Sequence, residues 1–261
     1  MTHRHGLAQM TDGASIAWSL EGPEDRPVLM LSNSLGTSMA MWEPQLPRFA
    51  ERFRVLRYDT RGHGRSWVSP GDYSLDRLGR DAVELLDALA IDAADFCGLS
   101  LGGMTGQWLG VFAPERVKRL VLANTSAYMG PPAVWQDRIH RVRGEGMAAI
   151  ADAVVARWFT AGFQGAAGAA RVRTGLLATS PVGYSACCAA IRDMDLRPLV
   201  HLIHTPTLII SGLQDPATPP EHAMSLHEQI AGSTLVSLDA SHLSNVEQPA
   251  AFADAVLAFL A

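Results

Sequence analysis

Short apolar runs alternate with longer segments of helical periodicity along most of the chain. Runs rich in Val, Leu and Ile, bounded by turn-forming residues, predict seven β-strands. These strands are Ala14–Leu20, Val28–Ser32, Val55–Tyr58, Asp95–Cys97, Arg119–Ala123, Thr207–Ser211 and Thr234–Ser237. Apolar residues three or four apart predict helices at Leu75–Leu89, Leu101–Phe112, Pro220–Ile230 and Pro249–Leu260. This alternation is typical of an α/β fold with a mostly parallel central sheet flanked by helices.

The alternation stops between residues 126 and 192, where only helical patterns remain. The predicted elements are a helix that begins at Pro132 and ends at Gly144–Gly146, a second helix at Met147–Phe159, a loose glycine-rich connector around Gly162–Gly168, and a further helix that begins at Ser180. We interpret residues 126–192 as a helical lid (cap) on a core formed by residues 1–125 and 193–261.

The first nine residues contain no apolar run, which argues against a secretory signal. We expect them to form a frayed terminus that includes His3 and His5. No stretch approaches the ~20 consecutive apolar residues of a membrane-spanning helix, so no membrane partner is predicted. The three cysteines form no disulfide pattern, and the simplest interpretation is a cytoplasmic protein, because thiols stay reduced there.

The charge balance excludes one class of function and favours another. The 261 residues are 48% hydrophobic and 18% charged, which is enough to bury a full core. A net charge of −5 lacks the basic footprint of a nucleic-acid-binding protein. Residues 126–192 nevertheless carry seven arginines and three acids, a local charge of +4, so the remainder carries −9. A cationic lid over an acidic body favours an anionic substrate, although most of these arginines are compatible with ordinary solvated helix faces.

The segment Gly98–Gly102 (Gly-Leu-Ser-Leu-Gly) matches the G-x-S-x-G nucleophile elbow. It follows a predicted strand and precedes a predicted helix, which is the context that this motif requires. The small residues allow a tight strand-to-helix turn that holds the Ser100 hydroxyl at the carboxyl end of the strand. The helix N-terminus behind it favours developing negative charge. Ser100 is therefore the predicted nucleophile.

A serine nucleophile needs a base that is oriented by an acid, and in this fold the chain order is Ser, acid, His. His242 follows the last predicted strand, and Asp215 follows the strand before it. Both therefore lie at the same edge of the sheet as Ser100, and we predict a Ser100–His242–Asp215 triad. Asp239 is the competing acid, and we expect it to pack at the end of its own strand.

The oxyanion of an acyl-transfer reaction needs two backbone N–H groups. One is expected from Leu101, which follows the nucleophile. The other is expected from the loop after the strand Val28–Ser32, where Leu35 is the predicted donor.

At this point the chain resembles a known family. The triad positions and the segment Tyr58–Ser66 (YDTRGHGRS) resemble α/β-hydrolases over nearly the whole chain. Narrower similarity lies in Leu31–Thr37 (LSNSLGT), Gly98–Met104 (GLSLGGM), Asp215–Pro220 (DPATPP) and Ser241–Pro249 (SHLSNVEQP). The first of these segments departs from the His-Gly that is usual in esterases and haloperoxidases. Together they resemble the 3-oxoadipate enol-lactonases, closely over the core and weakly over the lid.

The resemblance implies an α/β-hydrolase fold whose helical lid is inserted after the sixth strand. It also implies hydrolysis of 3-oxoadipate enol-lactone, a five-membered lactone with an acetate arm, to 3-oxoadipate in the β-ketoadipate pathway of aromatic-compound degradation, with no cofactor and no metal. This substrate is a small anion, which agrees with the cationic lid. Trp135 and Arg138 share one face of the first lid helix. We expect Arg138 to pair with the carboxylate and Trp135 to form a wall of the pocket. The alternative that Arg138 is an ordinary surface residue and Trp135 an ordinary core residue stays equally open.

Other activities on the same fold stay open: a generic carboxylesterase, a cofactor-free perhydrolase or a carbon–carbon bond hydrolase. Dehalogenases and epoxide hydrolases of this fold use an aspartate nucleophile, so Ser100 argues against them. A non-catalytic ligand receptor is the alternative from a different class, and the complete triad argues against it.

Three further features are interpreted as mainly structural. The first is a turn with Asp59, Arg61 and His63, whose charged groups are expected to pair with loop backbone. Trp42 is expected to line the pocket side of its loop or to pack under the lid. Cys97 is expected to be a small buried residue.

Overall fold

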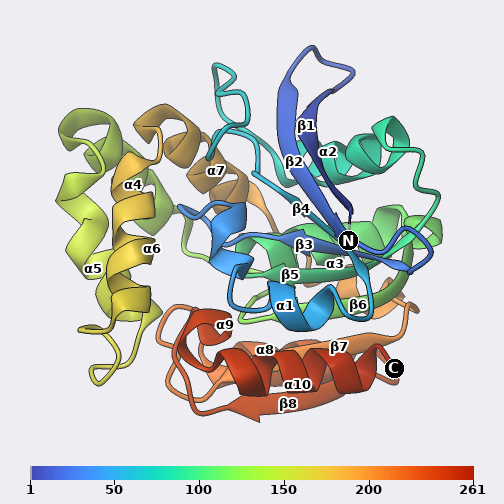
Figure 1. Ribbon diagram of the computed structural model, residues 1–261. Coiled ribbons are helices and arrows are strands. Elements are labelled where there is room, and N and C mark those ends of the chain that lie inside the picture. The colour runs from blue at the N-terminus through green and yellow to red at the C-terminus, as the bar shows by residue number, and fades with distance from the viewer. Residues whose placement is uncertain (1) are drawn as a thin grey trace.

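The computed structural model describes residues 2–261, which form one eight-stranded sheet with helices around it (Figure 1). The strand order is β1-β2-β4-β3-β5-β6-β7-β8. The β1–β2 and β2–β4 pairs are antiparallel, and the other pairs are parallel. The strands are β1 (Thr2–Gln9), β2 (Ser15–Gly22), β3 (Val28–Ser32), β4 (Arg54–Tyr58), β5 (Ala94–Leu99), β6 (Val117–Ala123), β7 (Thr207–Gly212) and β8 (Thr234–Leu238).

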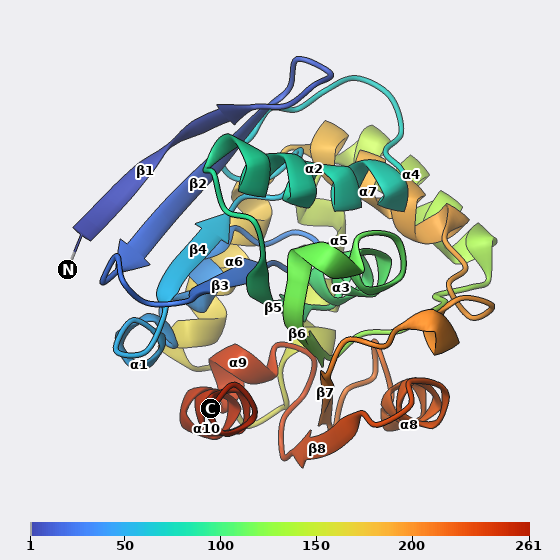
Figure 2. The same cartoon turned by 90° about the vertical axis from the view of Figure 1, so that its right-hand side faces the viewer.

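Helices cover both faces of this sheet. Figure 2 shows one group on one face, namely α2 (Leu75–Ala88), α3 (Leu101–Phe112) and α8 (Pro220–Gln229). The other face carries α1 (Leu46–Phe49) and α10 (Pro249–Phe259), with the short α9 (Ser244–Glu247) before it. Because both faces are covered, β5 and β7 are buried along their whole length, as expected for central parallel strands.

All seven predicted strands and all four predicted core helices are present within two residues of their expected bounds. The prediction for the N-terminus was wrong. Residues 2–9 form β1 and pair along their whole length with β2, and the His3 ring makes a 3.0 Å hydrogen bond with the Ser19 hydroxyl. β1 makes the strand before the helical segment the sixth, as the family resemblance implied.

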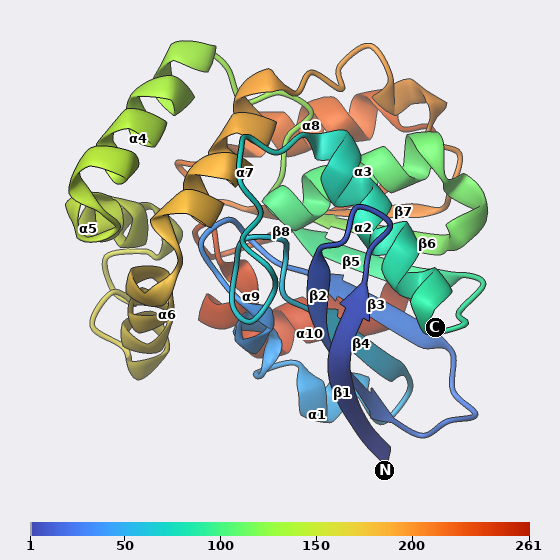
Figure 3. The same ribbon diagram turned by 90° about the horizontal axis from the view of Figure 1, so that it is seen from above.

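Four helices are inserted between β6 and β7, and we call them the insertion. They are α4 (Pro132–Glu145), α5 (Ala148–Trp158), α6 (Ala167–Ala178) and α7 (Pro181–Asp193). Figures 1 and 3 show α4, α5 and α6 gathered at one side of the molecule, with α7 between them and the core. The predicted connector at Gly162–Gly168 is non-helical through Ala166, and only its last two residues, Ala167 and Gly168, belong to α6, a helix that the sequence did not predict.

The turn after β4 joins several parts of the core. The Asp59 carboxylate accepts hydrogen bonds from the backbone N–H groups of Met39 (2.8 Å) and Arg65 (2.9 Å). Arg61 is buried and forms a two-point ion pair with Asp81 on α2. The charged groups of this turn therefore pair with loop backbone, as expected, and also with a buried carboxylate.

Trp42 does not line the cavity beside Ser100. Its side chain is fully buried in the core, where Nε1 donates a 2.9 Å hydrogen bond to Asn33 and the ring contacts Phe252 of α10. The expectation for Cys97 is confirmed, since its thiol is free and buried. Within residues 2–261 no single helix has the length and apolarity to cross a membrane. The helices α6 and α7 meet both criteria only when taken together, as a pair bent by 98°.

The buried imidazole of His63 predicts how stability depends on pH. Burial lowers the pKa of His63 to about 4, whereas an unfolded histidine titrates near 6.5. Between these two pKa values the unfolded chain binds more protons than the folded chain. The contribution of the neutral His63 to the free energy of unfolding is therefore present above about pH 6.5 and is lost as the pH falls toward 4. We expect the free energy of unfolding to decrease by about 3 kcal/mol over this window.

Urea denaturation at pH 7 and pH 4.5 would measure this decrease. The decrease should be smaller in His63→Gln and unchanged in His140→Gln, because His140 is exposed. Equal decreases in both variants would show that His63 is not responsible.

Candidate active site

Ser100 stands at a strained turn between β5 and α3. Its φ of 58° and ψ of −115° are unusual for a residue with a side chain. The turn is possible because two glycines let backbone segments meet. A Cβ on Gly98 would lie 2.1 Å from the Gly102 carbonyl oxygen, and a Cβ on Gly102 would lie 2.1 Å from the Ser32 carbonyl oxygen. The packing therefore holds the Ser100 hydroxyl in one place at the carboxyl end of β5.

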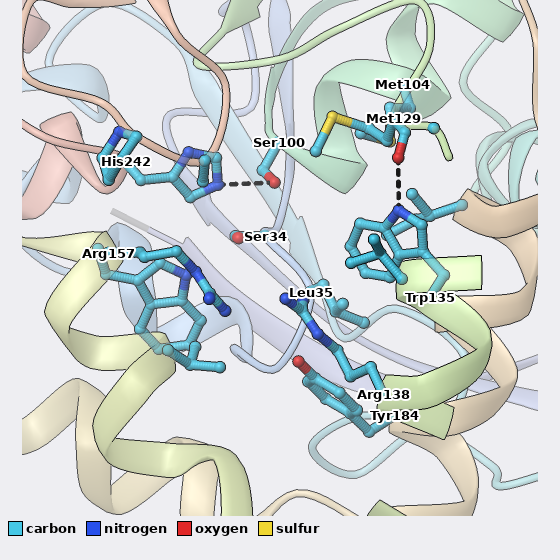
Figure 4. A pocket seen from close by; sticks show the side chains of 17 residues that line it. Ser34, Leu35, Ser100, Met104, Met129, Trp135, Arg138, Arg157, Tyr184 and His242 are labelled. Atoms are coloured by element: carbon cyan, nitrogen blue, oxygen red, sulfur yellow. Dashed lines mark hydrogen bonds between the residues drawn. The ribbon is translucent and has the colours of Figure 1, made fainter. Parts of the chain in front are cut away.

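The structure brings the three predicted triad residues together. His242 Nε2 lies 2.9 Å from Ser100 Oγ, and this hydrogen bond is drawn in Figure 4. His242 Nδ1 lies 2.8 Å from Asp215 Oδ2. All three side chains are buried. A serine hydroxyl, an imidazole and a carboxylate in this order can generate a nucleophile at neutral pH.

The Asp215 carboxylate is held in its charged form. Burial acts to raise its pKa, but the His242 imidazole and hydrogen bonds from Thr218 and Asn124 outweigh burial and keep the pKa below its usual range. Oδ2 accepts from Thr218 Oγ1 at 2.7 Å and from Asn124 Nδ2 at 3.0 Å. The competing acid Asp239 is exposed and accepts a hydrogen bond from the Gln214 side chain instead. It directly follows β8, at the end of its own strand, as predicted.

The two backbone N–H groups predicted to form the oxyanion hole have no internal partner. Among residues 2–261, neither the Leu35 N–H nor the Leu101 N–H donates to a protein acceptor. The neighbouring Gly36 N–H donates to His63 Nε2 at 2.9 Å, which fixes the loop that carries Leu35. The N–H of Gly36 is thus occupied, whereas the N–H of Leu35, the donor that the sequence predicted, is free.

The triad opens into a cavity of about 240 Å³ between the core and the insertion. This volume is below the roughly 300–1,000 Å³ of sites for drug-sized ligands, so the cavity suits a small substrate. Its apolar walls include Met104, Met129, Trp135, Val154, Trp158 and Ile191. Its polar groups include Ser34, Ser100, Arg138, Arg157, Tyr184 and His242 (Figure 4). No cluster of three metal-ligating side chains occurs in the described part of the chain.

Comparisons with known proteins agree with this geometry. A family profile described as "alpha/beta hydrolase fold" matches residues 27–143, and one described as "TAP-like protein" matches residues 180–261. The chain is 45% identical to 3-oxoadipate enol-lactonase 2 of Acinetobacter baylyi, over 92% of this chain and 90% of that protein. It belongs to the 3-oxoadipate enol-lactonase family of α/β-hydrolases.

Solved structures support the same placement. A crystal structure of the enol-lactonase from Burkholderia xenovorans LB400 has a TM-score of 0.96 and 43% identity, with coverage of 98% of this chain and 99% of that one. A hydrolase from Pseudomonas aeruginosa PA01 has the same TM-score and 49% identity, with 98% of each chain covered.

In this enol-lactonase-family chain, the arginines of the insertion fall into two groups. Five are paired with carboxylates: Arg141 with Glu145, Arg143 with Asp72, Arg171 with Glu43, Arg173 with Asp152, and Arg192 with Asp72 and Asp193. Arg138 and Arg157 form no ion pair within residues 2–261, and both line the catalytic cavity. The positive charge of the insertion is therefore left uncompensated at the cavity.

The sequence-predicted pair Trp135 and Arg138 does lie at the cavity. The Trp135 Nε1 donates to the Met129 carbonyl oxygen at 2.7 Å, and the Arg138 guanidinium carbon lies 4.6 Å from the centre of the Trp135 ring. The sequence did not single out Arg157. Burial and the positive charge of Arg138 lower its pKa, as expected for a half-buried cation beside another. Its position three residues after the inward-facing Val154 was the available signal.

The sequence also missed a connection between the insertion and the histidine loop. Ser241, next to His242, donates through Oγ to the Arg157 carbonyl oxygen at 2.9 Å. The buried Glu247 carboxylate accepts from the Ser241 N–H at 2.9 Å and from the backbone and side chain of Thr160. The end of α5 and the loop of His242 are thus held as one unit.

The two acids provide a matched test of the triad. Asp215→Asn should lower kcat for p-nitrophenyl acetate hydrolysis by about 10³- to 10⁴-fold, because the amide no longer holds the imidazole in the required tautomer. Asp239→Asn removes an exposed carboxylate of the same size and should change kcat little. A comparable loss in both variants would assign the orienting role to neither acid.

Proposed function

We propose that the chain hydrolyses 3-oxoadipate enol-lactone to 3-oxoadipate, through an acyl-enzyme formed on Ser100. The observation that carries this proposal is the pair of arginines without carboxylate partners, Arg138 and Arg157, in a small cavity that also holds Ser100 and His242. A small ester that bears its own carboxylate is the substrate that such a cavity accommodates. The enol-lactonases of Acinetobacter baylyi, 45% and 37% identical, support this choice of ester.

The chemistry begins with proton transfer from Ser100 to His242 Nε2 as Ser100 Oγ attacks the lactone carbonyl carbon. The negative charge that develops on the carbonyl oxygen is stabilised by the N–H groups of Leu35 and Leu101. Such donors are each worth about 3 kcal/mol of transition-state stabilisation. Asp215 holds the imidazole tautomer and stabilises its positive charge.

The ring then opens, and the enolate that leaves is protonated and becomes the ketone. Water activated by His242 attacks the acyl carbon, which releases Ser100 and leaves a second carboxylate on the product. No step of this sequence requires a metal or an organic cofactor.

The substrate carboxylate is placed by the insertion. Arg138 is held by its contact with the Trp135 ring, whose centre lies 4.6 Å from the guanidinium carbon. Arg157 belongs to the unit that includes the His242 loop. Two guanidinium groups in one cavity can bind a carboxylate with defined direction, so the lactone would be oriented relative to both Ser100 and the base. We infer that the insertion acts as the lid of this site; a cytoplasmic location stays a prediction.

Turnover of freshly generated 3-oxoadipate enol-lactone by the purified protein tests the proposal directly. We expect fast lactone loss, weak cleavage of a short p-nitrophenyl ester, and no activity in Ser100→Ala. Fast ester cleavage with an untouched lactone would retain the triad but exclude the enol-lactonase assignment. Binding of the lactone without turnover would favour a ligand receptor.

Arg138→Ala and Arg157→Ala test the carboxylate site. Each should lower kcat/KM for the lactone by about 10- to 100-fold, as expected for loss of a charged hydrogen bond. The methyl ester of the acetate arm has no charge, so its hydrolysis should change little in the same variants. Arg173→Ala, which removes an exposed arginine paired with Asp152, serves as the control. Equal losses on the lactone and its neutral ester would contradict a role in carboxylate binding.

A further inference from the structure

Ser34 carries an unused hydrogen-bonding group at the reaction centre. Its side chain is buried, at 2% exposure, and its Oγ has no hydrogen-bond partner within residues 2–261. Ser34 lines the same cavity as Ser100 and His242, and Figure 4 shows its oxygen near the Ser100–His242 hydrogen bond. Six other buried polar side-chain atoms of these residues also have no partner, but none of them belongs to a residue that lines this cavity.

The loop holds Ser34 in place without help from this hydroxyl. The Ser34 carbonyl oxygen accepts from the Thr37 N–H at 3.1 Å and from Thr37 Oγ1 at 2.7 Å. The Gly36 N–H is bound by His63. A buried hydroxyl without a partner destabilises a fold. An oxygen of the substrate is therefore the acceptor that would give this group a role.

The ester group of a substrate has two oxygens, and each needs its own hydrogen-bond donor in the transition state. The carbonyl oxygen is served by the N–H groups of Leu35 and Leu101. The other oxygen receives the electron pair of the bond that breaks, and no backbone donor described above is available for it. Ser34 precedes Leu35 in the chain, so its hydroxyl enters the cavity from the same loop as that N–H group.

We propose that Ser34 is a catalytic residue whose hydroxyl donates a hydrogen bond to the oxygen that leaves the acyl carbon. Ser100 Oγ bonds to that carbon, the bond from the carbon to the leaving oxygen breaks, and the electron pair stays on the leaving oxygen. The Ser100 proton passes to His242 Nε2 and from there to the leaving group, while the proton of Ser34 stays on Ser34. The inference rests on the proposed function only in identifying this oxygen with the ring oxygen of the lactone.

Ser34→Ala tests the proposal, because it removes the hydroxyl without adding volume. We expect kcat/KM, which reports acylation, to fall about 10- to 100-fold on the lactone. Two acetates that share an acyl group should separate the two oxygens. Phenyl acetate, with the more basic leaving oxygen, should lose more activity than p-nitrophenyl acetate, whose leaving group needs less stabilisation.

An equal loss on the two acetates would overturn the assignment to the leaving oxygen, and unchanged kcat/KM on all three substrates would overturn a catalytic role. The acetates need no lactone turnover, so absent lactone hydrolysis in the unaltered protein would reject the proposed function and leave the Ser34 comparison readable.

Ser185 provides a matched control, since its Oγ on α7 is also buried and without a partner but Ser185 does not line the cavity. Ser185→Ala should keep full activity. Both variants should keep or raise the melting temperature, because each removes an unsatisfied hydroxyl. A lowered melting temperature in Ser34→Ala, together with lost activity, would indicate a structural role and contradict the proposal.

Discussion

The close packing of backbone around Ser100 is the constraint on which the site depends. Ser100 has a positive φ, a conformation that costs about 1–3 kcal/mol for a residue with a side chain. It is maintained because β5 and α3 meet at Gly98 and Gly102, and because Gly102 contacts the backbone at the end of β3. The same contact brings the nucleophile next to the loop of Leu35. One steric arrangement therefore places both the Ser100 hydroxyl and the N–H groups that would stabilise the oxyanion formed when this hydroxyl attacks.

Ion pairing with carboxylates, more than the number of arginines, decides where positive charge remains in the insertion. The insertion is cationic as a whole, yet five of its seven arginines are neutralised by carboxylates. Exposed pairs of this kind add little stability, but they decide where positive potential remains. It remains at Arg138 and Arg157, in the wall of a cavity where water is partly excluded and electrostatic interactions are stronger than at the surface. The composition of the insertion alone could not show that contrast.

The sequence was sufficient to predict functional residues whose position depends on a local pattern. Ser100 and Asp215 each follow a strand end, and parallel strands bring such ends to one edge of the sheet. It was insufficient where structure depends on distant partners. β1 was missed because it is held by its backbone ladder with β2, and its Leu7 is 60% exposed, so no apolar periodicity marks it. The spacing from Val154 was a signal for the position of Arg157, but only the fold shows that Arg157 stays unpaired, whereas Arg143 pairs with Asp72, 71 residues away.

The groups assigned here to substrate share one property, which is that the folded chain does not satisfy them. Within residues 2–261, the N–H groups of Leu35 and Leu101, the Ser34 hydroxyl and the two cavity arginines have no carboxylate or carbonyl to bind. Buried polar groups of proteins are nearly always paired, because burial without a partner is unfavourable. Their concentration in one cavity means that the fold gives up stability there. A substrate that offers an oxyanion, a leaving oxygen and a carboxylate would satisfy all of them at once, and this is the composition of an acidic lactone in its transition state.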